Sequence, residues 1–446
     1  MTSGGTILIR GGIYNLTTQV KSNTAGTAAN YCKFWAYPGE TPIFDFTGLN
    51  DRGVYISKDY WHVRGIEVRF AGSNGICISS CGFNIIEGCV THDNGLEGTK
   101  LTGSAHDNLV INCDSYRNYD AKNHGEDADG FAAKSGVGTG NVFKGCRAWL
   151  NSDDGWDFYG CPNKVTIDSC FAFRNGINVW GDGAWAGDGN AFKLGGAGDT
   201  ASHIVMNSVA FDNAAKGFDQ NYNTAGLTVL NGTAYRNAKD NFSFYQTPAS
   251  GHKHVMKNNI AYLGGPNLDA TTVQECNSWQ IWPVAAADFI SLDTSLVLAP
   301  RKTDYSLPDN GFLRLEAGSG MIDAGVYVGI PFLGKAPDLG AFEYKGPTDI
   351  LNGQLSKSGE GFSLGQNFPN PFNPSTVISF NLPYQDNITL SITDLQGRVV
   401  NTQNYGKFSA GQHQIQFNAV NLPSGVYLYT IHTSRQSLSH KMLLVK

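Results

Sequence analysis

Short segments in which apolar and polar residues alternate recur through the middle of the chain. Each segment contains an aromatic residue between small or polar ones, as in DGFAAK (129–134) and DGWDFY (154–159). Because successive side chains of a β-strand point to opposite faces, this alternation predicts strands that turn the aromatic residue into a core. Five such segments align, and they predict one stacked column formed by Phe131, Trp156, Phe192, Phe218 and Phe242.

A second repeat precedes these segments. It has the form GCRAWLN at 145–151 and SCFAFRN at 169–175, with an asparagine five residues after the cysteine. Six copies end, at spacings of 24, 33, 24, 38 and 24 residues, at Asn94, Asn118, Asn151, Asn175, Asn213 and Asn237. A unit of 24 residues with two insertions is typical of a right-handed parallel β-helix whose coils stack about 4.8 Å apart. Asparagine is common in turns, but six in one register predict a ladder of amides hydrogen-bonded from coil to coil.

After residue 345 the pattern changes to short alternating strands separated by turn residues, as in PSGVYLYTIHTS (423–434). This pattern is typical of a small, immunoglobulin-like β-sandwich. We therefore predict an all-β protein with a right-handed parallel β-helix domain at 1–345, a linker at 346–361 and a β-sandwich at 362–446.

Composition agrees with an all-β protein and excludes some partners. The chain of 446 residues has 54 glycines, only 16% charged residues and a net charge of −6, which argues against nucleic acid as a ligand. No apolar run is long enough to span a membrane as a helix. Nine cysteines cannot all pair, and those in the repeat share one position, so we expect reduced, inward-facing side chains.

Aspartates gather beside the predicted ladder in NSDDGWDF (151–158). The repeat places Asp129 one coil from Asp154, and Asp157 one coil from Lys193, so we expect one exposed patch, with Asp153 in the turn that leads into it. Asp-Gly pairs also form ordinary turns. Four converging carboxylates without cations would repel each other, however, and all-oxygen ligation of this kind suits Ca²⁺ better than Zn²⁺.

Lys193 in GNAFKLGG (189–196) allows two interpretations. A surface ion pair with a nearby carboxylate is the commoner role of such a lysine. Alternatively, Lys193 is a general base, which requires that a cation and partial burial lower its pKa while the flanking carboxylates raise it. A base beside a cation suits removal of a proton next to a substrate carboxylate. On a 4-linked uronic-acid polymer, loss of the C5 proton and the C4 oxygen cleaves the chain by β-elimination.

Three stretches, HGEDADGFAAK, GCRAWLNSDDGWDFYG and GDGNAFKLGG, resemble in this order the family 9 polysaccharide lyases, typified by calcium-dependent pectate lyases. The likeness extends through most of 1–345. It implies Ca²⁺ as cofactor, polygalacturonate (pectin) as substrate and Lys193 as the catalytic base. The implied calcium ligands are Asp129, Asp153, Asp154 and Asp157. Two alternatives remain open: a non-catalytic, calcium-stabilised glycan-binding adhesin and a uronate C5-epimerase.

Further residues beside the ladder are candidates for substrate binding. Lys216 and Asn190 lie in the predicted acid column, and Arg174 and Arg236 share one register next to the asparagines. Each arginine could bind a substrate carboxylate, although a solvated turn residue is the simpler interpretation.

The C-terminal segment is similar to the sorting domains of the type IX secretion system, which implies that secretion machinery is a partner and that the protein is secreted or displayed at the cell surface. A carbohydrate-binding module is the alternative for this segment. The first residues, MTSGGTILIRGGIYNL, run into a predicted strand without a signal peptide, so we expect a truncated N-terminus. We also expect a monomer.

Overall fold

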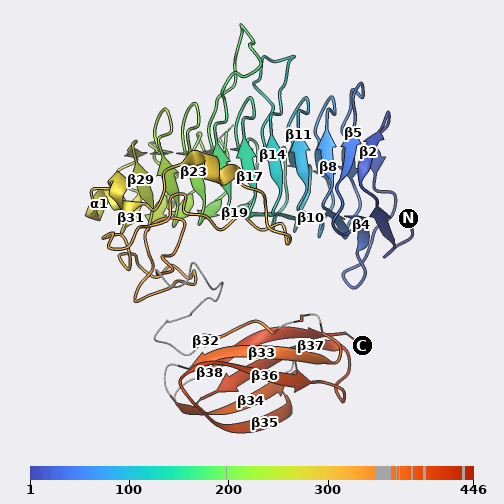
Figure 1. The fold of residues 1–446 in the computed structure, drawn as a ribbon, viewed down its shortest axis with the longest axis vertical. Coiled ribbons are helices and arrows are strands. Elements are labelled where there is room, and N and C mark those ends of the chain that lie inside the picture. Colours follow the sequence, from blue (N-terminus) through green and yellow to red (C-terminus); the bar gives the residue numbers. More distant parts are fainter. Residues whose placement is uncertain are drawn as a thin grey trace. The chain divides into compact units, whose positions relative to one another are not determined.

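The structure is a computed structural model that describes residues 1–196, 198–346, 363–367, 369–370, 372–382, 385–394, 398–433 and 437–445. The chain divides into two compact units, Met1–Phe332 with Ala336–Pro347, and Leu333–Lys335 with Thr348–Lys446. The first unit is a right-handed parallel β-helix and the second consists of antiparallel sheets, which confirms the predicted fold class (Figure 1). The predicted linker (346–361) lies, from residue 347 on, outside the described residues.

Each coil of the β-helix contributes one strand to each of three parallel sheets, here named A, B and C. Sheet A consists of β1 (Thr6–Ile9), β4 (Cys32–Ala36), β7 (Trp61–Arg64), β10 (Ile85–Glu87), β13 (Leu109–Ile111), β16 (Val142–Lys144), β19 (Thr166–Asp168), β22 (Ile204–Met206), β25 (Thr228–Leu230), β28 (Val255–Lys257) and β31 (Val273–Glu275). Sheet B consists of β2 (Gly12–Asn15), β5 (Pro42–Asp45), β8 (Glu67–Arg69), β11 (Val90–His92), β14 (Asp114–Tyr116), β17 (Arg147–Trp149), β20 (Phe171–Phe173), β23 (Val209–Phe211), β26 (Thr233–Tyr235) and β29 (Ile260–Tyr262). Sheet C consists of β3 (Val20–Lys21), β6 (Val54–Ile56), β9 (Ile76–Ser79), β12 (Thr99–Thr102), β15 (Phe131–Lys134), β18 (Trp156–Asp157), β21 (Phe192–Lys193), β24 (Phe218–Asp219), β27 (Phe242–Phe244) and β30 (Pro266–Leu268).

The repeated sequence explains how each coil turns. The first residue of the repeat lies between the strands of sheets A and B and has a left-handed backbone, as at Gly88 (φ 59°), Asn112 (φ 54°) and Gly145 (φ 62°). Glycine and asparagine adopt this conformation at the lowest cost. The cysteine that follows is buried in the core, and all nine cysteines of the chain are free, which confirms the prediction of reduced, inward-facing side chains.

The asparagine ladder and the aromatic column both exist. In the ladder, the side-chain Nδ2 of each asparagine donates to Oδ1 of the next at 2.8–3.0 Å, from Asn94 through Asn118, Asn151, Asn175 and Asn213 to Asn237. The aromatic rings of Phe131, Trp156, Phe192, Phe218 and Phe242 stack with centroids 4.8–5.0 Å apart inside sheet C. Both stacks lock the register of neighbouring coils, because a slip by one residue would break every contact in them.

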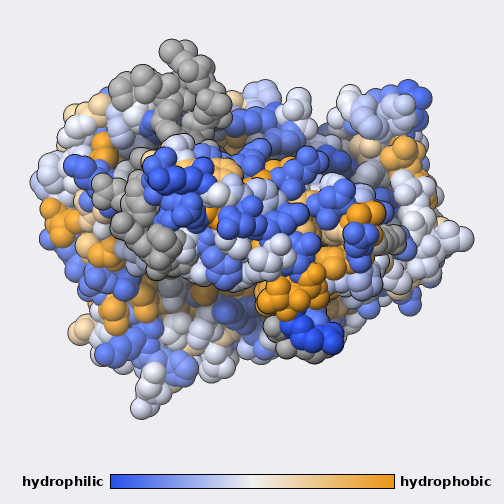
Figure 2. Space-filling model, turned by 90° about the horizontal axis from the view of Figure 1, so that it is seen from below, coloured by the Kyte–Doolittle hydropathy of each residue, from blue (hydrophilic) through white to orange (hydrophobic). Residues whose placement is uncertain are grey.

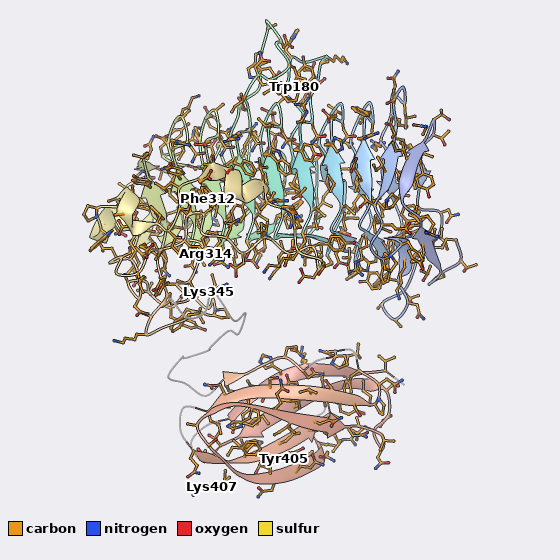
Figure 3. The ribbon with its side chains drawn as sticks, in the orientation of Figure 1. Trp180, Phe312, Arg314, Lys345, Tyr405 and Lys407 are labelled. Atoms are coloured by element: carbon orange, nitrogen blue, oxygen red, sulfur yellow. The ribbon has the colours of Figure 1, made fainter. Side chains whose placement is uncertain are left out.

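The chain after β31 closes the end of the β-helix and then covers sheet B. It contains the short helix α1 (Ser278–Ile281), the 3₁₀ turns Ala286–Asp288 and Thr294–Leu298, and irregular backbone up to residue 346. Its side chain Phe312, labelled in Figure 3, packs on Phe211 of β23 with centroids 4.8 Å apart. Arg301 of this segment contacts Asp114 of β14, which also binds Arg147. The cover thus fixes the outer face of sheet B and leaves sheet C to carry a site.

The second unit consists of two antiparallel sheets with a shared apolar core, as expected for a β-sandwich. One sheet contains β32 (Ser363–Leu364), β33 (Ser375–Leu382) and β36 (Gly411–Asn418); the other contains β34 (Asp386–Thr393), β35 (Val399–Phe408), β37 (Gly425–His432) and β38 (Ser437–Leu444). Among the described residues, no helix is long and apolar enough to cross a membrane. Figure 2 shows one face of the molecule as mainly hydrophilic, with hydrophobic residues in small separate patches.

Candidate active site

Sheet C brings the predicted aspartates and lysine together. Asp157 of β18 pairs with Lys193 of β21, so these two residues are neighbours on adjacent coils. On the other side, Asp157 pairs with Ala132 of β15. One turn earlier, the backbone N–H of Asp154 donates to Oδ1 of Asp129 at 3.1 Å, and that of Asn190 donates to Oδ1 of Asp154 at 2.7 Å. The strand register therefore converts a separation of 36 residues between Asp157 and Lys193 into one strand spacing.

The four aspartates form one tight group, here called the acid cluster. Each of Asp129, Asp153, Asp154 and Asp157 offers a carboxylate oxygen, and these oxygens lie within 4.8 Å of one another. The prediction that this patch is exposed is wrong, since the four residues are at most 2% exposed. Neighbouring coils pack above and below them, and the segment 176–190 folds over Asp153, whose Oδ1 accepts a hydrogen bond from the backbone of Asp188 at 2.6 Å.

Two lysines contact the acid cluster, and only one of them was predicted. The Nζ of Lys193 lies 3.1 Å from Asp154 and 3.6 Å from Asp157, and it donates to Asp188 at 3.0 Å. The Nζ of Lys134 lies 2.7 Å from Oδ2 of both Asp129 and Asp157. Lys134 is the last residue of the segment DGFAAK and lies two residues after Ala132, on the same face of β15. The alternation that predicted the aromatic column therefore also placed Lys134 on the face that carries Asp157 and Lys193.

Burial and charge pull the pKa values of the acid cluster in opposite directions. Burial raises the pKa of the carboxyls of Asp129 and Asp153, and that of Asp154 to about 6, and the neighbouring carboxylates add to the effect. At Asp157 burial acts in the same sense, but Lys134 and Lys193 outweigh it and lower the pKa. This crowding is typical of a site that binds a cation.

The carboxylates of the acid cluster stabilise the charged form of both lysines. Burial alone would lower the pKa of Lys193, but the carboxylates of Asp154 and Asp157 outweigh burial and raise the pKa far above its ordinary value. The balance at Lys134 is the same, with Asp129 and Asp157 as its partners. Without another cation near the carboxylates, both lysines are therefore charged and paired.

The acid cluster has the donor set of a calcium site. All of its ligand atoms are carboxylate oxygens, which Ca²⁺ prefers, and no histidine or cysteine side chain belongs to the group. Two of these buried oxygens, Oδ2 of Asp129 and Oδ2 of Asp154, are held by ion pairs, with the Nζ of Lys134 at 2.7 Å and the Nζ of Lys193 at 3.1 Å. Buried carboxylate oxygens that are balanced by ammonium groups would also bind a divalent cation in their place.

A cavity of about 500 Å³, here called the first cavity, opens onto the acid cluster. Its wall contains Asp153, Asp157 and Lys193 from the predicted set, and Tyr159 from the turn after β18. The remaining lining residues are Leu96, Glu97, Lys100, Glu126, Asp127, Lys134, Ser135 and Asp188. Glu126, Asp127 and Asp188 belong to the two insertions of the repeat, which form the loops that rise above the coils in Figure 1.

The four candidates for substrate binding have different surroundings. Asn190 contacts the acid cluster, because its Nδ2 donates to Oδ1 of Asp154 at 2.9 Å. Lys216, one coil further, donates to Asp219 at 3.0 Å. Arg174 donates to Thr294 of the covering segment and Arg236 binds Asp212, both from left-handed turn positions outside the first cavity. Their role in substrate binding stays a prediction.

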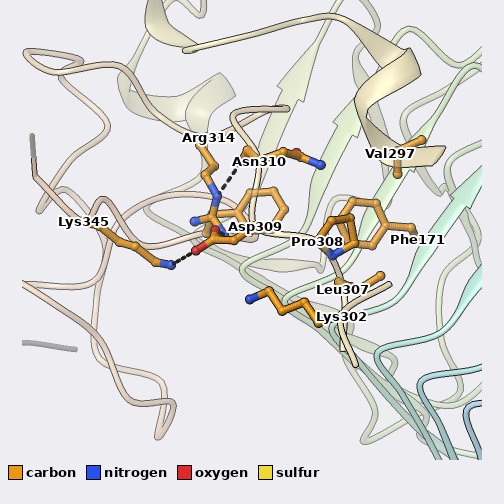
Figure 4. A pocket seen from close by; sticks show the side chains of 10 residues that line it. Phe171, Val297, Lys302, Leu307, Pro308, Asp309, Asn310, Arg314 and Lys345 are labelled. Carbon is orange, nitrogen blue, oxygen red and sulfur yellow. Dashed lines mark hydrogen bonds and ion pairs between the residues drawn. The ribbon is translucent and has the colours of Figure 1, made fainter. Parts of the chain in front are cut away.

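A smaller cavity of about 220 Å³ lies between sheet B and the segment that covers it (Figure 4). Lys302, Arg314 and Lys345 bring positive charge to it, and Lys345 donates to Asp309 at 2.7 Å. Phe171, Val297 and Leu307 supply an apolar wall. This cavity contains no acid cluster and no buried base, so the chemistry predicted from the sequence belongs to the first cavity.

Similarity to known proteins agrees with this geometry. The family described as Pel9A-like, right handed beta helix region matches residues 1–259, and the family described as Secretion system C-terminal sorting domain matches residues 366–446. Pectate lyase L of Dickeya chrysanthemi is 42% identical over 354 residues, which cover 76% of this chain and 83% of the relative. The crystal structure of pectate lyase Pel9A has a TM-score of 0.74 at 41% identity and covers 77% of this chain and 88% of its own.

A solved rhamnogalacturonan lyase is also similar, with a TM-score of 0.62 at 28% identity and coverage of 71% of this chain and 90% of its own. The resemblance noted in the sequence is thereby confirmed. Because one family matches more than half of the chain and the pectate lyases above match most of their own length, the chain belongs to the Pel9A-like right-handed β-helix family of polysaccharide lyases and carries a secretion-system sorting domain at its C-terminal end.

Proposed function

We propose that this polysaccharide lyase cleaves polygalacturonate by β-elimination, with Lys193 as the base and the acid cluster as the calcium site. The observation that carries the proposal is the position of the Lys193 Nζ, which lies 3.1 Å from Asp154 and in the wall of the first cavity. A base in this position can reach a sugar ring in the cavity while its other side contacts the carboxylates.

Lys193 takes the proton from C5 of a galacturonate unit. The electron pair of the C5–H bond forms the C4–C5 double bond, the C4–O bond breaks, and the leaving oxygen takes a proton from water. Bound Ca²⁺ would cancel the carboxylate charges that raise the pKa of Lys193 and would stabilise the negative charge that develops beside the substrate carboxylate. The buried carboxylates of Asp129 and Asp154 hold the site rigid, because each accepts a backbone hydrogen bond from the next coil.

Two features bear on substrate and location. The pectate lyase relatives are 42% and 41% identical, against 28% for the rhamnogalacturonan lyase, so polygalacturonate is the preferred candidate over rhamnogalacturonan. The C-terminal sorting domain supports export of the enzyme through the type IX secretion system, to the medium or the cell surface.

The test is the ultraviolet absorbance of the unsaturated product, followed with polygalacturonate or rhamnogalacturonan in the presence of Ca²⁺. A lyase produces the conjugated double bond, whereas an epimerase or an adhesin leaves the absorbance unchanged. We expect Lys193→Ala to lower kcat by about 10²–10⁴-fold, the usual contribution of a general base. Lys144→Ala, which removes an exposed lysine paired with Asp168 on sheet A, is the matched control. Activity of Lys193→Ala equal to that of the control would disprove the role of the base.

A further inference from the structure

The two insertions of the repeat, 119–128 and 176–189, pair with each other. The backbone N–H of Ala186 donates to the carbonyl of His124 at 2.9 Å, and the Tyr119 hydroxyl donates to Oδ2 of Asp182 at 2.7 Å. Asn178 and Asp182 exchange two further hydrogen bonds within the second insertion. These contacts join segments about 60 residues apart in the sequence into one structure, here called the double loop, which rises above the coils in Figure 1.

The double loop lines a second cavity besides the first. This second cavity has a volume of about 390 Å³, and its wall includes Phe70, Asp93, Arg117, Tyr119 and Trp180. The consecutive residues Asn94 and Gly95 line it, whereas Leu96 and Glu97 line the first cavity. The two cavities are therefore adjacent at one turn of the β-helix but share none of their lining residues.

Aromatic rings dominate one side of the second cavity. The rings of Tyr119 and Trp180 stack with centroids 4.8 Å apart and planes 14° apart, and Trp185 extends the stack at 5.8 Å from Trp180. Figure 3 shows Trp180 on the loop that rises above the sheets. Phe70, which is 41% exposed, lies on the coils below. Because the hydrogen bonds of the double loop hold Tyr119 in place, these rings are preorganised for a flat ligand.

Charged groups complete the wall. The guanidinium of Arg117 binds Oδ1 of Asp93 at 3.1 Å, and Asp93 also binds Nδ1 of His92 at 2.6 Å. The Arg117 side chain is 44% exposed, so part of its donor fork is open to a ligand. An aromatic face beside an exposed guanidinium suits a ring with an apolar face and a carboxylate at its edge.

We propose that the second cavity is a non-catalytic binding site for one or two pyranose rings of a uronic-acid polysaccharide. A sugar ring stacks its C–H face on Trp180, and its carboxylate accepts hydrogen bonds from Arg117. The choice of a uronic-acid polymer rests on the proposed function, whereas the aromatic site itself does not. A polymer bound in the second cavity has a higher effective concentration at the first cavity, because the two cavities lie on either side of one turn.

The test is retardation of the full chain in gels that contain polygalacturonate. All proteins carry Lys193→Ala and are run in EGTA, so that the polymer is not cleaved. Without Ca²⁺ the carboxylates that line the first cavity repel the polyanion, so retardation reports binding elsewhere. We expect Trp180→Ala in this background to weaken binding about tenfold, the upper range for one aromatic contact, with Trp180→Phe in between. Arg117→Ala weakens binding to polygalacturonate but not to a neutral galactan. Tyr327→Ala removes an aromatic side chain that is 70% exposed and serves as the matched control.

Two outcomes separate this inference from the proposed function. If wild-type protein yields no unsaturated product but its retardation still depends on Trp180, the proposed function is wrong and the second cavity is a binding site. If Trp180→Ala and Tyr327→Ala migrate alike, the second cavity does not bind the polysaccharide, whatever the wild-type enzyme cleaves.

Discussion

Two stacks of buried polar side chains lie side by side at the turn between sheets B and C, and they behave in opposite ways. The ladder from Asn94 to Asn237 satisfies itself, because each amide has a donor for the next coil and an acceptor for the previous one. Three members of the acid cluster, Asp153, Asp154 and Asp157, follow Asn151 in the same coil, and their ionised carboxylates offer only acceptors. The same coil geometry thus produces a scaffold from amides and a cation site from carboxylates.

The acid cluster depends on the ladder for its geometry. Carboxylates that repel each other would move apart unless the backbone held them. Here the ladder locks each coil to the next, and the backbone N–H groups of Asp154 and Asn190 bind the carboxylates of the previous coil. The amide ladder supplies stability, whereas the carboxylates, balanced by Lys134 and Lys193, supply a site for a cation.

The largest effect is expected when a carboxylate is introduced into the ladder. Nδ2 of Asn213 donates to Ala172 O, Phe211 O and Asn237 Oδ1 at 2.8–3.1 Å, so Asn213→Asp would bring a charged oxygen against three acceptors. We expect a loss of about 3–5 kcal/mol in the free energy of unfolding, against about 2 kcal/mol for Asn213→Ala. Denaturant unfolding of the full chain measures both. A smaller loss for the aspartate than for the alanine would contradict this account.

The reverse substitution places an amide in the acid cluster. Asp129→Asn keeps the volume and the Oδ1 acceptor for Asp154, but removes one charge from the proposed calcium site. We expect activity to fall about 100-fold or more, because the site loses a calcium ligand charge.

Calcium addition provides the second readout for Asp129→Asn. At a Ca²⁺ concentration about 100 times Kd, wild-type protein should gain about 2.7 kcal/mol and melt several degrees higher than in EGTA, and the variant should lose most of this gain. If both proteins gained equally from Ca²⁺, the ion would bind elsewhere.

The smallest effect concerns a third kind of buried polar group, a neutral histidine. Nδ1 of His203 accepts from the backbone of Val165 at 3.1 Å, and burial lowers the pKa of His203 to about 3 from its ordinary 6.5. Since the unfolded chain binds the proton first, stability is lost as the pH falls below 6.5, by about 2 kcal/mol between about pH 7 and pH 5. His203→Asn should remove this part of the pH slope, because Asn141 accepts from Asn108 at the equivalent position of another coil. An unchanged slope in unfolding measured across this range would exclude His203 as its source.

Much of this architecture follows from local patterns. The coil period, the Asn ladder, the aromatic column and the free cysteines were all predicted, because each repeats at a fixed register and parallel strands stack that register directly. The same alignment placed Asp157 next to Lys193 on adjacent coils, as the strand pairing confirms. The residue roles, namely calcium ligation by the acid cluster and proton abstraction by Lys193, stay predictions for the experiments above.

Other features did not follow from the repeat. The prediction of an exposed acid patch was wrong, because the spacing of the coils does not predict that the segment 176–190 folds over Asp153. Lys134 was missed although it lies on the predicted face of β15, since no partner in sequence indicates that its Nζ reaches both Asp129 and Asp157. Asp188 and Trp180 lie in an insertion, where the periodic signal is interrupted.

The β-helix, its register and the residues that stack in it follow from the sequence, because a repeat of about one coil leaves each position only one neighbour above and one below. The three-dimensional structure was needed to show which of these residues are buried, where the lysine side chains end, and how two insertions about 60 residues apart join into the double loop beside two cavities. Those features depend on the three-dimensional path of non-repeating segments and on side-chain reach between coils. Periodicity carries no information about either.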